Sequence, residues 1–259
     1  LSAKGTVKII NPEFDKIIGD ELSSEIIYKK GRLYFNKLNL KTSGGKYSGI
    51  GNLPLKRTST NNNTQDNIDQ SIYFTLAGKA NNFDFLPPYL SILDSIKSTT
   101  LNDSGVVLLL DITGSFSNPI RNGKVFLNNM NFYLDQLKVP ITNIKSEISI
   151  NNNILKIDSF IGKSKKNNSK NIYGKIAQKI NKLLNKKKDN YDENIYAYGK
   201  IKLNSFFSPY FDINIQSDRI HIDSAYDYFQ GSGSINFDIK GQDTIMVTGI
   251  FKPNSNDFI

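Results

Sequence analysis

Apolar and polar side chains alternate without interruption in the stretch Phe211-Asp212-Ile213-Asn214-Ile215-Gln216. The same alternation recurs in residues 71–77 and 235–240. A period of two residues is the spacing of a β-strand that buries one face and leaves the other in water, as in antiparallel sheets. Gly, Asn, Asp and Pro separate such stretches at short intervals, for example at 118–123 and 151–153. The sequence therefore predicts an all-β fold.

Two segments depart from this pattern and are predicted to be helical insertions. The first lies near 88–97, directly after the turn expected at Pro87-Pro88. The second lies near 172–188, where Ile176, Ile180, Leu183 and Leu184 fall on one helical stripe. A basic amphipathic helix of this kind can lie on an anionic membrane surface. The candidates for that contact are Lys175, Lys179, Lys182 and Lys186. The alternative is a surface helix that packs its stripe on the sheet and leaves its lysines in water.

The chain also resembles itself. Ser24-Glu25-Ile26 recurs as Ser146-Glu147-Ile148, and Leu33 then matches Leu155 at the same spacing. Further matches follow in the same order. They join residues 51–55 to 199–203, residues 111–114 to 238–241, and Gly123-Lys124-Val125 to both Gly249-Ile250-Phe251 and Gly5-Thr6-Val7. The alternative is that amphipathic strands resemble one another by alternation alone.

These matches predict three repeat segments. The first covers 1–122 and begins in mid-repeat, and the second covers 123–248 with a lysine-rich insertion at 163–194. Residues 249–259 form the start of the third. On this interpretation the chain is a fragment of a longer repetitive protein.

The net charge of +9 first suggests a nucleic-acid partner. However, ten lysines and no acid lie between Lys163 and Lys188, so the rest of the chain sums to −1. A nucleic-acid surface spreads its cations, with interleaved aromatics, along the binding face. We therefore expect no nucleic-acid partner.

The sequence contains few of the residues and motifs that catalytic sites require. It has no cysteine, so neither a disulfide framework nor a thiolate metal site is expected. His221 is the only histidine and lies between Ile220 and Ile222, so alternation predicts that its ring points to water. A single histidine excludes paired-histidine zinc motifs. We expect no enzyme activity, no catalytic residue, no metal site and no cofactor. The longest apolar run, Val106 to Leu110, is too short to span a membrane, which needs roughly 20 residues.

Several motifs, taken in order, resemble the TamB and AsmA-like family of bacterial envelope proteins, which includes the translocation and assembly module. The segment from Gly114 to Val125 is similar to that family's turn with the pattern G-x-φ-x-N-P-x-x-x-G-x-φ. It is followed by N-x-x-L-x-I-D-x-F within 151–160, by G-x-I-x-L at 199–203 and by F-D-I-N-I at 211–215. The lysine-rich insertion and the Asn-rich stretch 56–70 depart from the family pattern, and the exact subfamily stays open.

The resemblance implies a repetitive, curled, antiparallel-rich sheet that forms an elongated apolar groove. It implies a periplasmic protein, anchored to the inner membrane through a segment outside this chain. Such a protein holds phospholipid acyl chains for lipid transport or outer-membrane biogenesis, with an outer-membrane β-barrel assembly protein as a further partner. The lipid-binding residues would be the inward strand positions Val7, Ile9, Ile26, Leu33, Phe35, Ile72, Phe74, Leu76, Leu108, Leu110, Ile112, Val125, Leu127, Ile148, Leu155, Ile157, Ile201, Leu203, Phe211, Ile213, Ile215, Ile235, Phe237 and Ile239.

Two other interpretations stay open. The main alternative is a structural or adhesive surface protein built of β-sandwich or solenoid repeats, in which the same residues form an ordinary closed core. A carbohydrate-active β-enzyme would need exposed aromatics and paired carboxylates, and the absence of Trp weighs against it.

Overall fold

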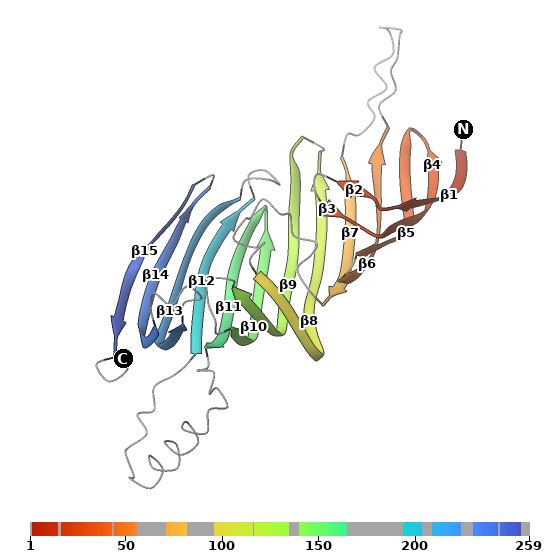
Figure 1. The fold of residues 1–259 in the computed structure, drawn as a ribbon. Coiled ribbons are helices and arrows are strands. Elements are labelled where there is room, and N and C mark those ends of the chain that lie inside the picture. The colour runs from red at the N-terminus through yellow and green to blue at the C-terminus, as the bar shows by residue number, and fades with distance from the viewer. Residues whose placement is uncertain are drawn as a thin grey trace.

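The structure, a computed structural model, describes residues 2–14, 17–42, 44–55, 71–81, 96–115, 117–134, 140–164, 194–203, 209–223, 230–242 and 244–254. Thirteen strands form one antiparallel sheet, in which the strands lie side by side in chain order and only β2 and β3 are left out (Figure 1). They are β1 (Ser2–Ile10), β4 (Glu21–Lys29), β5 (Arg32–Thr42), β6 (Gly45–Pro54), β7 (Tyr73–Ala80), β8 (Ile96–Gly114), β9 (Pro119–Leu134), β10 (Ile141–Asn151), β11 (Ile154–Ser164), β12 (Asn194–Lys202), β13 (Tyr210–Asp223), β14 (Gln230–Gly241) and β15 (Ile245–Pro253). The short strands β2 (Glu13–Phe14) and β3 (Ile17–Ile18) pair separately. The predicted all-β fold is confirmed.

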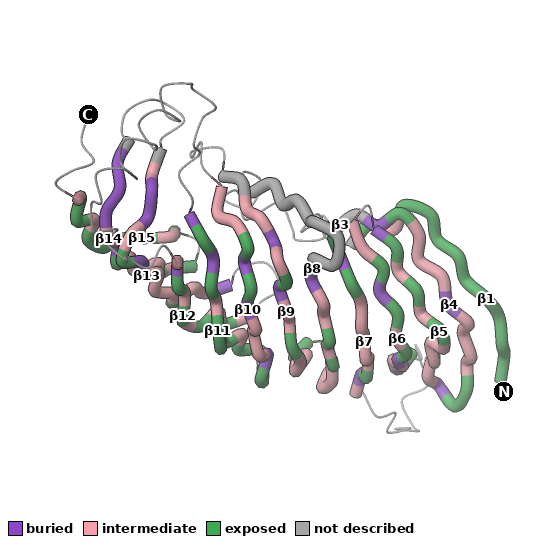
Figure 2. The backbone as a smooth tube through the Cα atoms, turned by 90° about the horizontal axis from the view of Figure 1, so that it is seen from below, coloured by how far each residue is buried: buried purple, intermediate pink, exposed green. Residues whose placement is uncertain are grey.

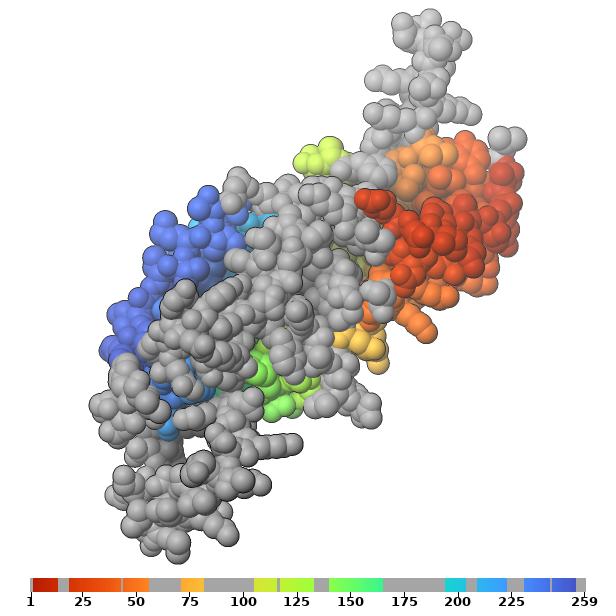
Figure 3. Space-filling model, in the orientation of Figure 1, coloured from red at the N-terminus to blue at the C-terminus, as the bar shows by residue number. Residues whose placement is uncertain are grey.

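The sheet is open. Its edge strands β1 and β15 each pair with one neighbour, so the sheet does not close on itself within the described residues. The two edges lie at opposite ends of the molecule, as the red and blue ends of Figure 3 show. β1 is exposed along its whole length and is green throughout in Figure 2.

Two hairpins show why neighbouring strands pair with each other. Lys30 and Gly31 link β4 to β5, and both have positive φ, at 48° and 76°. Asn152 and Asn153 link β10 to β11 in the same way, at 48° and 66°. Two consecutive residues of positive φ form the type I′ turn, whose twist matches that of the flanking strands. Gly and Asn adopt this conformation most readily, whereas Lys30 adopts it at a cost.

The predicted helices do not appear in the part of the chain that the structure describes. Ile96 and Lys97 open β8, where they pair with Leu134 and Tyr133 of β9, so the helix predicted near 88–97 is wrong at its end. Local composition suggested a helix there, but pairing with β9 extends the strand. The rest of that segment and the segment 172–188 lie outside the described residues. The described parts contain no helix that is long and apolar enough to span a membrane.

The pairing register agrees with the internal repeat. Leu33 pairs with Leu53, and its predicted counterpart Leu155 pairs with Ile201. A hydrogen bond between equivalent positions also recurs. Leu55 N donates to Gly31 O at 2.9 Å in the first copy, and Leu203 N donates to Asn153 O at 2.8 Å in the second. The equivalent positions therefore share a register over β4–β6 and β10–β12.

The correspondence continues to the last strand. Gly51 pairs with Phe74, as Gly199 pairs with Ile213. Leu110 pairs with Gly123 in β9, and Phe237 with Gly249 in β15. Strands β4–β9 thus match β10–β15 one by one.

One proposed match is shifted. Gly5 pairs with Ile26, but the equivalent of Ile26 is Ile148, which pairs with Val125 and not with Gly123. Gly5 therefore corresponds to Val125, because register follows the strand partner and not the recurrence of a glycine. The boundaries of the repeat copies stay a prediction.

The most deeply buried side chains lie near one end of the central strands, the end at which β5 is followed by β6. The main cluster consists of Tyr47, Ala80, Val106, Leu127, Met130 and Ile144. Met130 and Ile144 pair directly across β9 and β10, and both are fully buried. Burial of such a side chain stabilises the fold by about 1.5–3 kcal/mol. A second cluster, Ile195, Ile220 and Ile235, lies further along the sheet.

Candidate functional site

The candidate site is one face of the sheet, defined here as the face that carries Leu33, Phe74 and Ile213 and called the apolar face. Directly paired residues of neighbouring strands point to the same face. The pairs run without a break from Phe35 through Gly51 and Phe74 to Ile112. Followed across the whole sheet, the pairing and the alternation along each strand place 22 of the 24 predicted lipid-binding residues on this face. The other two, Ile72 and Leu203, directly flank β7 and β12 and continue the same alternation. Their shared position is observed, whereas their role stays a prediction.

Most of these side chains are neither fully buried nor fully exposed. Ile72, Leu127 and Ile235 are buried, and Val7 and Ile9 of the edge strand are exposed. The other 19 are half-buried. In a β-sandwich, a second sheet covers the inner face at about 10 Å and buries such residues. The apolar face therefore keeps contact with solvent along most of its length.

Aromatic rings lie over glycines on this face. A β-carbon on Gly51 would overlap the ring of Phe74, and a β-carbon on Gly249 would overlap that of Phe237. The ring centroid of Phe35 lies 5.8 Å from that of Phe74 in a tilted arrangement. Because these glycines have no side chain, the rings pack directly against the backbone of the neighbouring strand. No side chain projects from this part of the face at the glycine positions.

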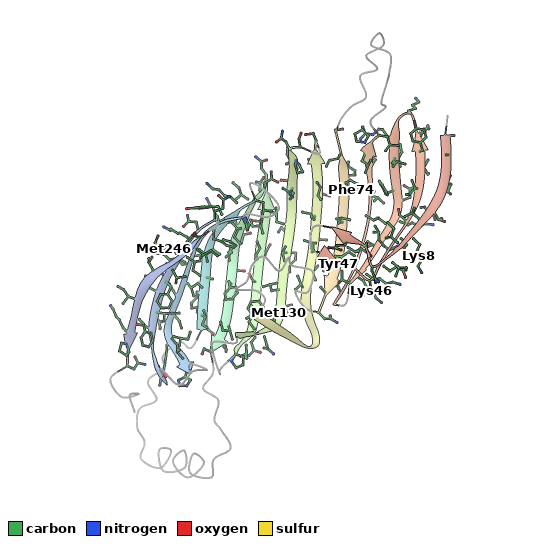
Figure 4. All side chains as sticks on the ribbon, turned by 45° about the horizontal axis from the view of Figure 1, so that its top comes forward. Lys8, Lys46, Tyr47, Phe74, Met130 and Met246 are labelled. Atoms are coloured by element: carbon green, nitrogen blue, oxygen red, sulfur yellow. The ribbon has the colours of Figure 1, made fainter. Side chains whose placement is uncertain are left out.

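Tyr47 shows how the faces divide. Lys46 and Tyr47 are neighbours in β6, and Figure 4 labels both. Lys46 is exposed on the opposite face, called the polar face, whereas Tyr47 pairs with Gly78 and lies in the buried cluster. Burial disfavours the phenolate and raises the pKa of Tyr47 to about 12.

Arg121 is a charged residue on the apolar face that sequence reasoning missed. It pairs with Ile112 and is only 5% exposed. Its guanidinium Nη1 donates to Asn153 Oδ1 at 3.1 Å, and its backbone N donates to the same oxygen at 2.9 Å. Burial lowers the pKa of Arg121. The signal was present in the sequence, because Arg121 has the same parity in its strand as Val125 and Leu127.

Three buried serines were also missed. Ser146 Oγ donates to Ser159 O at 2.7 Å, Ser24 Oγ to Asn36 O at 3.1 Å, and Ser217 Oγ to Asn194 O at 2.8 Å. Each lies at or beside a register shift between its strand and a neighbouring one. A bulge leaves backbone groups out of the ladder, and a short hydroxyl can satisfy them. Two of the three were visible in the sequence as the recurring Ser-Glu-Ile.

The prediction that His221 points to water is wrong. His221 as a whole residue is 8% exposed, and its ring Nδ1 lies 3.1 Å from Ser232 Oγ. Ser164 Oγ at the end of β11 donates to the backbone oxygen of His221 at 2.9 Å. Alternation places His221 opposite to Ile220, as expected, but it does not reveal that β11 and β13 meet at this point.

The polar face carries ion pairs that follow the strands. Glu21 lies 3.1 Å from Lys8 Nζ and 3.6 Å from Lys41 Nζ. Glu25 lies 2.7 Å from Lys37 Nζ and 3.8 Å from Lys4 Nζ. The hydrogen bond from Lys8 lowers the pKa of Glu21, and the one from Lys37 lowers the pKa of Glu25. These exposed pairs are ordinary solvated contacts that are worth little individually.

Among the residues that the structure describes, no group of three or more His, Asp or Glu side chains could hold a metal ion. The membrane-surface candidates Lys175, Lys179, Lys182 and Lys186 lie outside the described residues. Comparisons of the chain with protein-family models, curated proteins and solved structures find no match. The geometry of the apolar face is therefore the main basis for assigning a function.

Proposed function

We propose that the apolar face forms an elongated groove that holds lipid acyl chains, in a TamB- or AsmA-like periplasmic protein that serves phospholipid transport or outer-membrane assembly. The half-burial of 19 apolar residues on one face of an open sheet carries this proposal. A sheet with one apolar face must cover that face. Acyl chains do so without specific polar contacts, and each buried methylene contributes about 0.8 kcal/mol.

The curl that would turn this face into a groove is supported by the register shifts. They occur in seven of the strand pairs: β4–β5, β5–β6, β8–β9, β9–β10, β10–β11, β11–β12 and β13–β14. A β-bulge bends its strand and increases the local right-handed twist. Repeated bulges favour a sheet that curves around its apolar face. An outer-membrane β-barrel protein would be a partner of such a carrier.

Adjacent leucines of β8 offer a matched test. Leu110 pairs with Leu76 and Gly123 on the apolar face, whereas Leu109 is 45% exposed on the polar face. We expect Leu110→Asp to remain folded, because its carboxylate reaches water when no lipid is bound. The variant should lose most co-purifying lipid, because bound acyl chains would bury the unpaired charge. Leu109→Asp introduces the same group but should keep the lipid.

The measurements are mass spectrometry of extracted lipid and thermal unfolding, made on both variants and on the parent. A structural or adhesive protein with a closed core gives a different pattern. The parent then carries no lipid, and Leu110→Asp unfolds because the cost of the buried charge falls on folding. That pattern would reject the lipid proposal.

A further inference from the structure

Tyrosine and amide side chains form a patch on the polar face of β12, β13 and β14. Directly paired residues of neighbouring strands point to the same face. The patch consists of two adjacent rows of such residues and is called the tyrosine–amide patch. One row is Tyr198, Asn214 and Asp238, and the other is Tyr196, Gln216 and Asn236.

The two tyrosine rings are exposed and yet held in place. Tyr198 is 49% exposed, and Tyr196 is 37% exposed. Gln216 Nε2 donates to Tyr198 Oη at 2.8 Å, and Asn194 Nδ2 donates to Tyr196 Oη at 3.2 Å. A ligand that packs on a ring already fixed in this way costs less side-chain ordering than one that binds a mobile ring.

Hydrogen bonds also link the amides of the patch. Asn214 Nδ2 donates to Asn236 Oδ1 at 2.8 Å and to Asp238 Oδ1 at 3.0 Å. An amide side chain carries both a donor and an acceptor. The bonds described use the donor of Gln216 and the acceptor of Asn236, and each of these two amides also has a group of the opposite kind. The patch can therefore both donate and accept hydrogen bonds beside the exposed rings.

The first copy of the repeat shows that the fold does not require these residues. By the register of the repeat, Ile50 is the equivalent of Tyr198, and Leu109 is the equivalent of Asn236. Both first-copy residues are exposed aliphatic side chains, at 52% and 45%. Strands with the same pairing thus carry aliphatic side chains at these positions. The tyrosine and the amide are therefore a property of the second copy and are not dictated by the strand scaffold.

Charge and composition narrow the chemistry of a partner. Asp238 is the one charged member of the patch, and the next row of the same strands carries Lys200, Asp212 and Lys240. The two lysines and two aspartates cancel, so this surface does not attract a polyanion such as nucleic acid or an anionic membrane. None of the six patch residues is aliphatic, whereas the core of a protein–protein interface is mainly apolar. A neutral, polar partner with faces that can pack on rings fits best.

We propose that the tyrosine–amide patch binds a neutral carbohydrate chain. The C–H groups of a pyranose ring pack on the electron-rich face of a tyrosine ring. The hydroxyl groups of sugars both donate and accept hydrogen bonds, as the amides and the carboxylate of the patch require. Two residues along a strand span about 7 Å, so one chain can contact both Tyr196 and Tyr198.

The probes are cellohexaose and chitohexaose, two neutral oligosaccharides whose β-1,4 linkages give a flat chain. Isothermal titration calorimetry of the intact chain measures their binding. We expect at least one probe to bind, with an affinity that does not depend on salt, because no ion pair forms. Tyr198→Ala should weaken binding about tenfold, since the surface for stacking is lost, whereas Tyr198→Phe should stay within about threefold of the parent. Thermal unfolding verifies that each variant is folded.

Tyr73→Ala is the matched control. Tyr73 is 42% exposed on the polar face of β7, outside the patch, so its replacement should leave binding unchanged. No binding of either probe, or equal weakening by Tyr73→Ala and Tyr198→Ala, would overturn the proposal. Binding that high salt abolishes and that dextran sulfate reproduces would also overturn it, because the patch would then belong to an anionic partner.

Discussion

The ring of Phe74 lies over Gly51, so that the neighbouring strands β6 and β7 approach with no side chain between ring and backbone. We expect Gly51→Ala to destabilise the protein by about 1–3 kcal/mol, because the added methyl group overlaps the ring and forces repacking. The free energy of unfolding in urea measures the effect. Gly5→Ala is the matched control, since a β-carbon there meets nothing within 4 Å. Equal effects of the two substitutions would contradict the packing argument.

Ser146 tests the buried hydroxyls. Its hydrogen bond to Ser159 O satisfies a carbonyl beside a bulge, and we expect Ser146→Ala to cost about 1 kcal/mol. Urea unfolding again provides the measurement. Ser48→Ala, an exposed change on the polar face, should stay within about 0.5 kcal/mol of the parent. A neutral Ser146→Ala would show that the hydroxyl is dispensable at the bulge.

Tyr47 predicts a pH dependence at the alkaline end. Its folded-state pKa of about 12 lies above the ordinary value of 10.0. The stability linked to this phenol is therefore complete below pH 10 and is lost as the pH rises toward 12. Absorbance titration should show one late-ionising tyrosine that is absent from Tyr47→Phe. Thermal unfolding of Tyr47→Phe should depend less on pH in this window, and an unchanged dependence would contradict the assignment.

The lysine-rich insertion should be dispensable for folding. Lys163 and Asn194 pair directly at its base, so a short turn can replace the residues between them. We expect replacement of 165–192 by Asn-Gly to leave urea unfolding cooperative and its midpoint nearly unchanged. The same variant should lose binding to vesicles that contain anionic lipid, if the lysines contact a membrane. Loss of cooperative unfolding would instead make the insertion part of the core.

Alternation in the sequence was sufficient to place the 24 apolar residues on one face, because the period of a strand is strictly two residues. Recurring positions such as Ser24 and Ser146 also revealed the repeat, and the register bears out most of its matches. Only the tertiary structure decided which side chains other strands bury and where bulges shift the strand register. It showed that His221 is buried, that Ile96 belongs to a strand, and that Gly5 corresponds to Val125. Such features arise where strands distant in the chain meet or where one extra residue shifts the pairing register. A local sequence pattern predicts neither of these.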